Sequence, residues 1–282
     1  QGITLRFVLD VHEQGDNTAD SVPCDRLPDF NFKADAMNLI LIDPRELEDD
    51  SATLTGRRAE HIRKTLRAKE GDTIRVGIVN GLIGSGLIRG IEPGRVRLDI
   101  KTDKPAPVKA PTCLILALPR PIMLKRVLAQ TASMGIEKIF LINAGRVEKS
   151  FFKASLLSEE NLREYLLLGL EQAVDTVLPE ITIHRRFRPF IEDLLPEISR
   201  DYPVRLAAHP GGAIKLAPAL LPEPASPALV AIGPEGGWLD FEIERFAEQG
   251  FGCFSLGPRI LRVDTAVPAI LAQLQLLRTI AG

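Results

Sequence analysis

The sequence predicts an α/β protein with two folded parts, a small β-barrel over residues 37–107 and a domain with a parallel sheet over residues 108–282. Short strands with glycine-rich turns dominate the first part, whereas strands alternate with helices in the second. Such alternation is typical of a parallel sheet with helices on both faces. A proline-rich stretch over residues 104–111 reads as a stiff linker between the two parts.

Residues 1–36 differ from the rest of the chain, because they carry 3 basic and 7 acidic side chains and lack a sustained period. They do not show the positively charged start and apolar run that mark a signal peptide. Met37 precedes an apolar run over residues 39–42 and reads like a natural start followed by a strand. We therefore expect residues 1–36 to be a leader or extension outside the core fold.

The barrel prediction depends on a hairpin. Residues 71–79 alternate in polarity, turn at Asn80-Gly81, and return through residues 86–88. Asn-Gly between two apolar runs is a strong hairpin signal. A third strand is expected over residues 95–100, and one helical piece precedes the hairpin over residues 60–67.

In the second part, apolar runs and helical periods alternate from residue 113 to the end of the sequence. The expected strands are 113–118, 138–142, 204–208, 228–232 and 253–256, and the expected helices are about 122–134, 158–174, 189–199, 240–249 and 265–280.

Net charge, cysteine content and the length of apolar runs limit the classes of function that the chain can have. The net charge of -2 argues against a wholly basic nucleic-acid coat, although residues 37–110 carry a surplus of 3 positive charges that is compatible with RNA contact. Three widely spaced cysteines without a CxxC predict neither a disulfide framework nor a zinc site and fit a reducing cytosol. No apolar run approaches the roughly 18 residues of a membrane helix.

Three predicted strands end in glycine-containing loops: AIGPEGGW at residues 231–238, SLGPR at 255–259 and AHPGG at 208–212. Ligands of parallel sheets bind beyond the carboxyl ends of strands, so these loops predict one pocket floor.

Asp240 and either Asp264 or Thr265 read better as helix N-caps than as catalysts. The sequence contains no GxGxxG, GxSxG or HExxH, and its four histidines do not cluster, which disfavours dinucleotide, hydrolase and metal sites.

The pair formed by IGPEGG at residues 232–237 and LGPRILRVDTA at residues 256–266 resembles the RsmE family of 16S rRNA uridine N3-methyltransferases in the SPOUT superfamily. The resemblance runs from Met37 to the last residue. Residues 61–72 resemble the family's PUA-like barrel, and Glu171-Gln172 with residues 178–181 resembles the middle of its catalytic domain.

The resemblance implies a C-terminal trefoil knot, S-adenosylmethionine as cofactor, and a cytoplasmic homodimer that acts on ribosomal RNA or the small subunit without membrane or metal. Main-chain groups bared by glycine would hold the cofactor where side chains do not fit. The implied cofactor residues are His209, Pro210, Ile232, Gly233, Pro234, Glu235, Gly236, Gly237, Leu256, Gly257, Ile260, Leu261, Arg262 and Thr265.

The reaction then needs an extruded uracil whose N3 loses its proton as the methyl group transfers. A cation would stabilise the anionic base, and Arg262 is the candidate, with a salt bridge or phosphate contact as the alternative. Glu171, with its neighbour Gln172, would orient the base, unless both lie on a solvated helix face. The sequence singles out no general base.

A dense basic run suits contact with RNA phosphates, although a solvated surface helix is the alternative. The expected RNA-binding residues are Arg57, Arg58, Arg63, Lys64 and Arg67 in that run, together with Arg146 after the second strand of the larger domain.

Three departures from the family pattern lie on the expected substrate side. Asp175 stands where the family has an arginine, Val263-Asp264 replaces Thr-Glu, and QTASMG at residues 130–135 replaces KATELG. We read Asp175 as a negative charge near the RNA entrance. A paralogue with another RNA target, or one that binds RNA without turnover, therefore stays an alternative to the methyltransferase.

Overall fold

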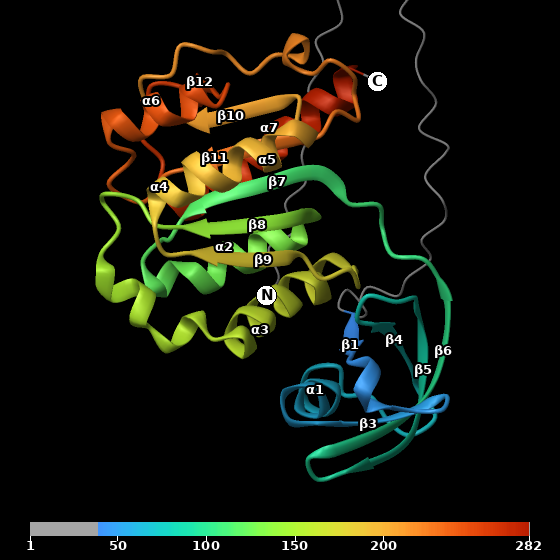
Figure 1. The fold of residues 1–282 in the computed structure, drawn as a ribbon. Coiled ribbons are helices and arrows are strands. Elements are labelled where there is room, and N and C mark those ends of the chain that lie inside the picture. The colour runs from blue at the N-terminus through green and yellow to red at the C-terminus, as the bar shows by residue number, and fades with distance from the viewer. Residues whose placement is uncertain (1–38, 282) are drawn as a thin grey trace, which may run out of the picture. The chain divides into compact units, whose positions relative to one another are not determined.

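The computed structural model describes residues 39–281, which all belong to one compact unit of the chain. The expected leader over residues 1–36 and the expected start at Met37 lie outside these residues. Two six-stranded sheets organise the described part (Figure 1). One is formed by residues before 105 and the other by residues after 109, on the two sides of the proline-rich stretch.

The N-terminal sheet has the strand order β1-β4-β5-β6-β3-β2. Only the β1–β4 pair is parallel, and the expected Asn80-Gly81 hairpin joins β4 to β5, with Asn80 at φ 60°. Apolar side chains such as Ile42, Leu54 and Leu98 are fully buried between the sheet and its helical segment. The strands are β1 (Ile40–Ile42), β2 (Leu47–Glu48), β3 (Ser51–Thr55), β4 (Thr73–Ile78), β5 (Ile83–Glu92) and β6 (Arg95–Lys104).

The helical segment of this first part is α1 (Gly56–Glu60), which continues without a break into a π-helical turn over His61–Thr65. It begins four residues earlier than the expected helix over residues 60–67. Ala59 and Ile62 face the core, whereas the basic side chains around them lie toward solvent or toward acidic partners.

The second sheet is parallel throughout, in the order β12-β10-β11-β7-β8-β9, which confirms the expected parallel α/β arrangement. The central strands read as continuous apolar runs because both faces of the sheet are covered. The strands are β7 (Ala110–Ala117), β8 (Ile136–Ile142), β9 (Glu180–His184), β10 (Val204–Ala208), β11 (Ala228–Ile232) and β12 (Gly252–Phe254).

The edge strand β9 was not expected, because its half-buried sequence EITIH lacks the apolar run of its neighbours. The helix expected over residues 189–199 is interrupted instead. Its Phe190–Leu194 turn is π-helical and Pro196 opens the short helix that follows. The helices are α2 (Pro121–Ser133), α3 (Glu159–Ala173), α4 (Phe187–Pro189), α5 (Leu195–Ile198), α6 (Asp240–Glu248) and α7 (Val263–Ala281).

Helices cover both faces of the parallel sheet: α5 crosses in front of it in Figure 1, and α2 and α7 lie behind it. The N-cap expectations were wrong, because both helices already include the residues expected to cap them. Asp240 is the first residue of α6, whose N-cap is Leu239, and Asp264 lies in the first turn of α7. The carboxyl ends of β10, β11 and β12 therefore meet at one edge, beside the start of α7.

Candidate functional site

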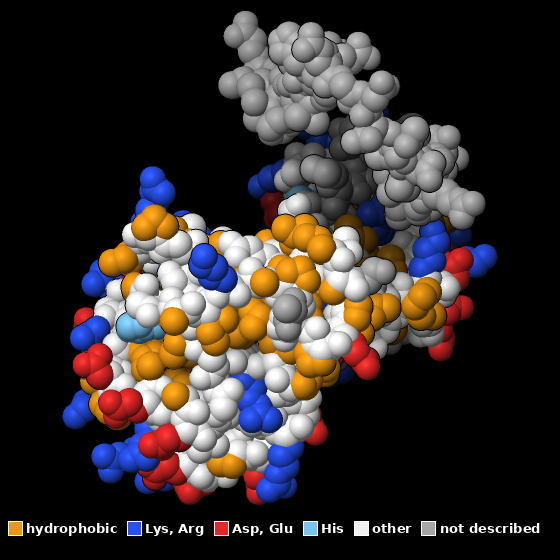
Figure 2. Space-filling view, turned by 90° about the horizontal axis from the view of Figure 1, so that it is seen from above, with side chains coloured by type: hydrophobic (Ala, Val, Ile, Leu, Met, Phe, Trp, Pro, Cys, Tyr) orange, Lys and Arg blue, Asp and Glu red, His pale blue; other side chains and the backbone are white. Residues whose placement is uncertain are grey.

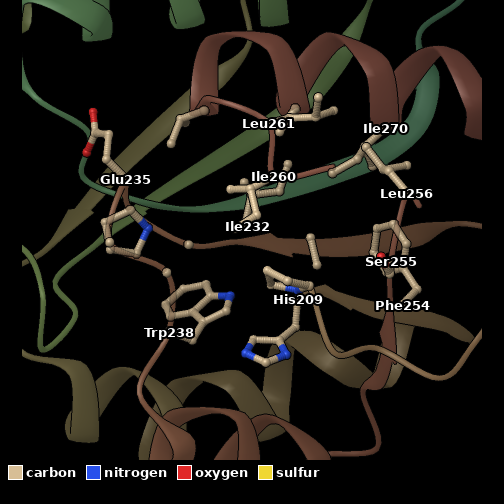
Figure 3. A pocket seen from close by; sticks show the side chains of 18 of the residues that line it. His209, Ile232, Glu235, Trp238, Phe254, Ser255, Leu256, Ile260, Leu261 and Ile270 are labelled. Carbon is tan, nitrogen blue, oxygen red and sulfur yellow. The ribbon is translucent and has the colours of Figure 1, made fainter. Parts of the chain in front are cut away.

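A cavity of about 240 Å³ lies at that edge. Loops after β10, β11 and β12 and the first turns of α7 form its walls, as Figure 3 shows. The three glycine-containing strand ends therefore meet, as expected. The lining residues are Ala208, His209, Pro210, Ile232, Gly233, Pro234, Glu235, Gly236, Gly237, Trp238, Phe254, Ser255, Leu256, Arg259, Ile260, Leu261, Val263, Ala266 and Ile270.

Glycine is favoured at two points of these walls. A Cβ on Gly233 would lie 3.2 to 3.3 Å from the indole ring of Trp238, and Gly237 has φ +75°, which side chains rarely adopt. Gly212 is pressed against Phe254, so that a Cβ there would come within 2.3 Å of the Phe254 backbone. The loop after β10 can thus approach the end of β12 this closely because residue 212 has no side chain.

The polar groups of the cavity are few. The Nδ1 atom of His209 accepts the Gly211 N–H at 3.2 Å, so the neutral ring carries its proton on Nε2. The indole Nε1 of Trp238 is buried and has no hydrogen-bond partner in residues 39–281. Apolar side chains, among them Ile232 and Leu256, make up most of the remaining wall. Such a cavity suits a ligand with a flat apolar part that is held by backbone groups.

Of the residues expected to bind cofactor, Gly257, Arg262 and Thr265 do not line this cavity, and the others do. The side chain of Arg262 is 73% exposed, with Nη2 3.5 Å from the Met123 sulfur and Nε 3.5 Å from an Asp264 carboxylate oxygen. Thr265 is exposed in the first turn of α7. Arg262 therefore lies beside the cavity wall with its guanidinium toward solvent.

The structure does not bring Glu171 to the same cavity. Its carboxylate is bound by Arg57 through two hydrogen bonds of 2.9 Å, and its carbonyl oxygen accepts the Leu39 N–H at 3.0 Å. This bidentate bond raises the pKa of Arg57. Within residues 39–281, Glu171 therefore connects α3 to the N-terminal part of the chain and lies apart from Arg262.

Most of the expected RNA-binding cations are already paired. Besides Arg57, Arg58 binds Glu46 and lowers the pKa of that carboxyl group. Arg63 and Lys64 both bind Glu60. Arg67 is exposed, with φ 50°, and Arg146 lies against the 236–238 loop, where it donates to the Gly236 and Trp238 carbonyl oxygens.

The reading of Asp175 as a charge near the RNA entrance is wrong for this chain. Its side chain is 6% exposed and accepts a 2.7 Å bond from Lys109, whose side chain is 10% exposed. A second oxygen of Asp175 accepts the Val177 N–H at 2.9 Å. The substitution is part of the packing between the linker and the end of α3, so it no longer favours a paralogue without turnover.

Sequence reasoning missed part of the cavity wall: Ala208, Trp238, Phe254, Ser255, Arg259, Val263, Ala266 and Ile270. Four of them stand inside the quoted loops and a fifth directly precedes one, so taking every loop residue with its neighbours finds Ala208, Trp238, Phe254, Ser255 and Arg259. Val263, Ala266 and Ile270 follow helical spacing along one face of α7. Ala266 and Ile270 lie in the helix predicted over residues 265–280, so their spacing was available in the sequence, whereas Val263 lies before its predicted start.

In the part of the chain that the structure describes, no group of three or more His, Cys, Asp or Glu side chains could hold a metal ion. No helix of that part is both long and apolar enough to span a bilayer.

The chain is similar to known RNA methyltransferases. A family model described as RNA methyltransferase domain matches residues 105–275. Ribosomal RNA small subunit methyltransferase E of Treponema pallidum is 31% identical over 245 residues, which cover 84% of this chain and 90% of that protein. The protein of the same name from Bacillus subtilis is 25% identical, covering 82% of this chain and 93% of its own length.

Among solved structures, ribosomal RNA small subunit methyltransferase E from Neisseria gonorrhoeae, bound to S-adenosyl methionine, matches with a TM-score of 0.67. The two chains are 22% identical, and the match covers 86% of this chain and 98% of that one, which shows a shared fold. With the Treponema relative and the family match, these findings confirm the resemblance that the paired glycine motifs predicted. The chain belongs to the RNA methyltransferase family that includes ribosomal RNA small subunit methyltransferase E.

Proposed function

We propose that this protein transfers a methyl group from S-adenosylmethionine to N3 of a uridine in small-subunit ribosomal RNA. The observation that carries the proposal is the meeting of the 232–237 and 254–261 loops in one apolar cavity. The names of the relatives support a ribosomal RNA substrate, and the Neisseria structure was solved with this cofactor. The position of the methyl group follows only from the motif resemblance.

The cavity residues fit such a cofactor. Within residues 39–281 the buried Trp238 N–H has no hydrogen-bond partner, and a Cβ on Gly233 would crowd the Trp238 ring. Main-chain groups of residues 232–237 and 256–261 would hold the adenosine and methionine parts, with His209 and Pro210 in the wall formed by the loop after β10. When bound, the cofactor supplies a sulfonium-activated methyl group, an electrophile that needs no metal activation.

Arg262 is the group proposed to stabilise the uracil as its N3 proton leaves. Its guanidinium is exposed beside the cavity wall and retains donors beyond its long contact with Asp264. A positive charge there would favour the anionic base over the neutral one. Glu171 lies outside this cavity, so within one chain its proposed task is to hold Arg57, and it can reach a reacting base only from a second copy.

A homodimer in the cytosol is part of the proposal. Ile122, Ile260, Leu276 and Ile280 are large apolar side chains that are each more than half exposed. Figure 2 shows hydrophobic side chains gathered in a broad band on the face seen from above. A second copy would cover such a surface, and sedimentation velocity would test this through the mass of the particle.

The finer fold features are proposals as well: a PUA-like barrel over residues 37–107, a methyltransferase domain over residues 108–282, and a trefoil knot at its end. The close approach of Gly212 to the Phe254 backbone and the packing of α7 behind the sheet support a threaded end. A knot requires the 255–263 segment to pass through the loop formed by residues 209–227. If the segment passes outside that loop, the chain is not knotted and this part of the proposal is refuted.

The decisive experiment is nucleoside mass spectrometry of small-subunit RNA from cells with and without the gene. The expected result is loss of 3-methyluridine at one position in the deletion strain and its return when purified protein and S-adenosylmethionine are added to the deficient subunits. Unchanged 3-methyluridine in the deletion strain would refute the proposal, and a different lost nucleoside would refute the N3 assignment.

A further inference from the structure

Glu242, in the first turn of α6, is a carboxylate that is fully buried. It forms no ion pair with any residue of the described chain; instead, its two oxygens accept backbone N–H groups, one from Gly145 at 2.7 Å and one from Leu239 at 2.8 Å. A buried carboxylate is costly unless such hydrogen bonds satisfy it. The two hydrogen bonds therefore compensate for the burial of the Glu242 carboxylate.

The two donors belong to different loops. Gly145 follows β8, and Leu239 ends the loop that follows β11 and lines the cavity. The loops touch so closely that a Cβ on Gly145 would lie 2.3 Å from the Leu239 Cδ1 atom. Glu242 therefore joins the end of one strand to the wall of the cofactor cavity.

Arg146 adds a second connection between the same loops. One guanidinium nitrogen donates to the Gly236 carbonyl oxygen and lies 3.4 Å from that of Trp238. Its aliphatic stem packs on the loop, because a Cβ on Gly236 would come within 3.0 Å of the Arg146 Cδ atom. Arg146 of the β8 loop and Glu242 of α6 thus hold the glycine loop at three positions, Gly236, Trp238 and Leu239.

We propose that Glu242 and Arg146 are positioning residues that fix the 233–239 loop in the shape that accepts the cofactor. The inference rests on the proposed function, because it concerns the same cavity. A loop with glycines at positions 233, 236 and 237 is costly to order, and a ligand that had to order it would bind more weakly. Fastening the loop in the free protein removes that cost, and it gives Arg146 a task other than the RNA contact expected from the sequence.

The test compares Glu242→Gln with Glu244→Gln, a change at an exposed glutamate on the same helix. Glutamine keeps the shape of Glu242 but offers one acceptor oxygen and an NH₂ group, so one of the two N–H groups loses its partner. Calorimetry with S-adenosylmethionine should show Kd raised about tenfold in Glu242→Gln and unchanged in Glu244→Gln. Trp238 is the only tryptophan of the chain, so its emission reports the loop directly, and a red shift is expected in Glu242→Gln alone.

Arg146→Met gives a second reading at an exposed side chain, where misfolding is not expected. It should also raise Kd and shift the Trp238 emission, whereas Arg146→Lys should recover part of the affinity. In both positions KM for the cofactor should rise while kcat changes by no more than about twofold to threefold, because neither side chain touches the reacting atoms.

Wild-type affinity and emission in a folded Glu242→Gln or Arg146→Met protein would overturn the inference. A fall in thermal stability with an unchanged Kd would overturn it as well, because it would show that these side chains stabilise the fold and do not affect cofactor binding. If the wild-type protein itself did not bind S-adenosylmethionine, the proposed function would fail instead.

Discussion

Lys109 and Asp175 form a buried ion pair whose removal should measurably destabilise the protein. Their side chains are 10% and 6% exposed, and Nζ lies 2.7 Å from the carboxylate oxygen. Lys109→Met removes the cation but leaves the carboxylate buried, with the Val177 N–H as its one remaining partner among residues 39–281. Breaking a buried pair in this way costs about 3–5 kcal/mol. The remaining hydrogen bond places our expectation at the lower end, near 3 kcal/mol.

For a chain of this size, each kcal/mol lowers the midpoint of thermal unfolding by roughly 2–4 °C, so Lys109→Met should lose about 6–12 °C. Calorimetric melting together with urea unfolding measures this change. Lys104→Met, at an exposed lysine five positions earlier at the end of β6, is the matched control and should stay within about 0.5 kcal/mol.

A double variant separates the pair from general packing. Lys109→Met with Asp175→Asn removes the unpaired charge and keeps an oxygen for the Val177 N–H, so it should be more stable than Lys109→Met alone. A Lys109→Met protein as stable as the wild type would refute the reasoning, and so would a double variant whose loss equals the sum of the single losses.

Three further outcomes are expected. Glu60→Gln frees the two cations it binds, so RNA affinity should rise and the slope of log affinity against log salt should steepen by about 0.7–0.9 per cation; a filter-binding series with an unchanged slope would place this helix off the RNA. Gly233→Ala pushes against Trp238 and should weaken S-adenosylmethionine at least about tenfold in calorimetry without unfolding the sheet; wild-type Kd would contradict this. Arg45, through its hydrogen bonds, holds the pKa of Asp43 well below its usual range. The ionised Asp43 therefore stabilises the folded protein above about pH 4, and this contribution is lost as the pH falls. Asp43→Asn should flatten the acid limb of a melting-temperature curve below about pH 5, and an unaltered limb would argue against it.

The place of the cavity was predictable because glycine-containing loops line part of it. Where the main chain itself faces a cavity, the sequence has glycine and the position can be recognised. The glycines at 233, 236 and 237 follow a continuous apolar strand whose carboxyl end can be assigned. The same logic extends to α7, whose cavity face repeats at helical spacing. The strand β9 and the interrupted helix over residues 187–198 were harder to predict, because their shape depends on packing at the edge of the sheet and on local prolines.

The charged side chains could not be interpreted in the same way, since a charge in a sequence does not reveal its partner. Glu171 and Arg57 are separated by 114 positions and Lys109 and Asp175 by 66, yet each pair meets within hydrogen-bond distance. A basic run that suggested free RNA-binding cations is therefore largely neutralised by Glu46, Glu60 and Glu171.

This pairing changes how RNA attraction must work in one chain. An RNA phosphate that binds Arg57 must displace the Glu171 carboxylate, which holds Arg57 through two hydrogen bonds. Breaking those bonds reduces the net binding free energy of the phosphate. Salt then acts twice: it weakens the exposed part of the ion pair and it screens the phosphate. The net salt slope for Arg57 should thus be smaller than for Arg67, which is exposed and has no acidic partner among residues 39–281. Substituting each in turn by methionine and comparing the two slopes tests whether the interaction with Glu171 persists when RNA is bound.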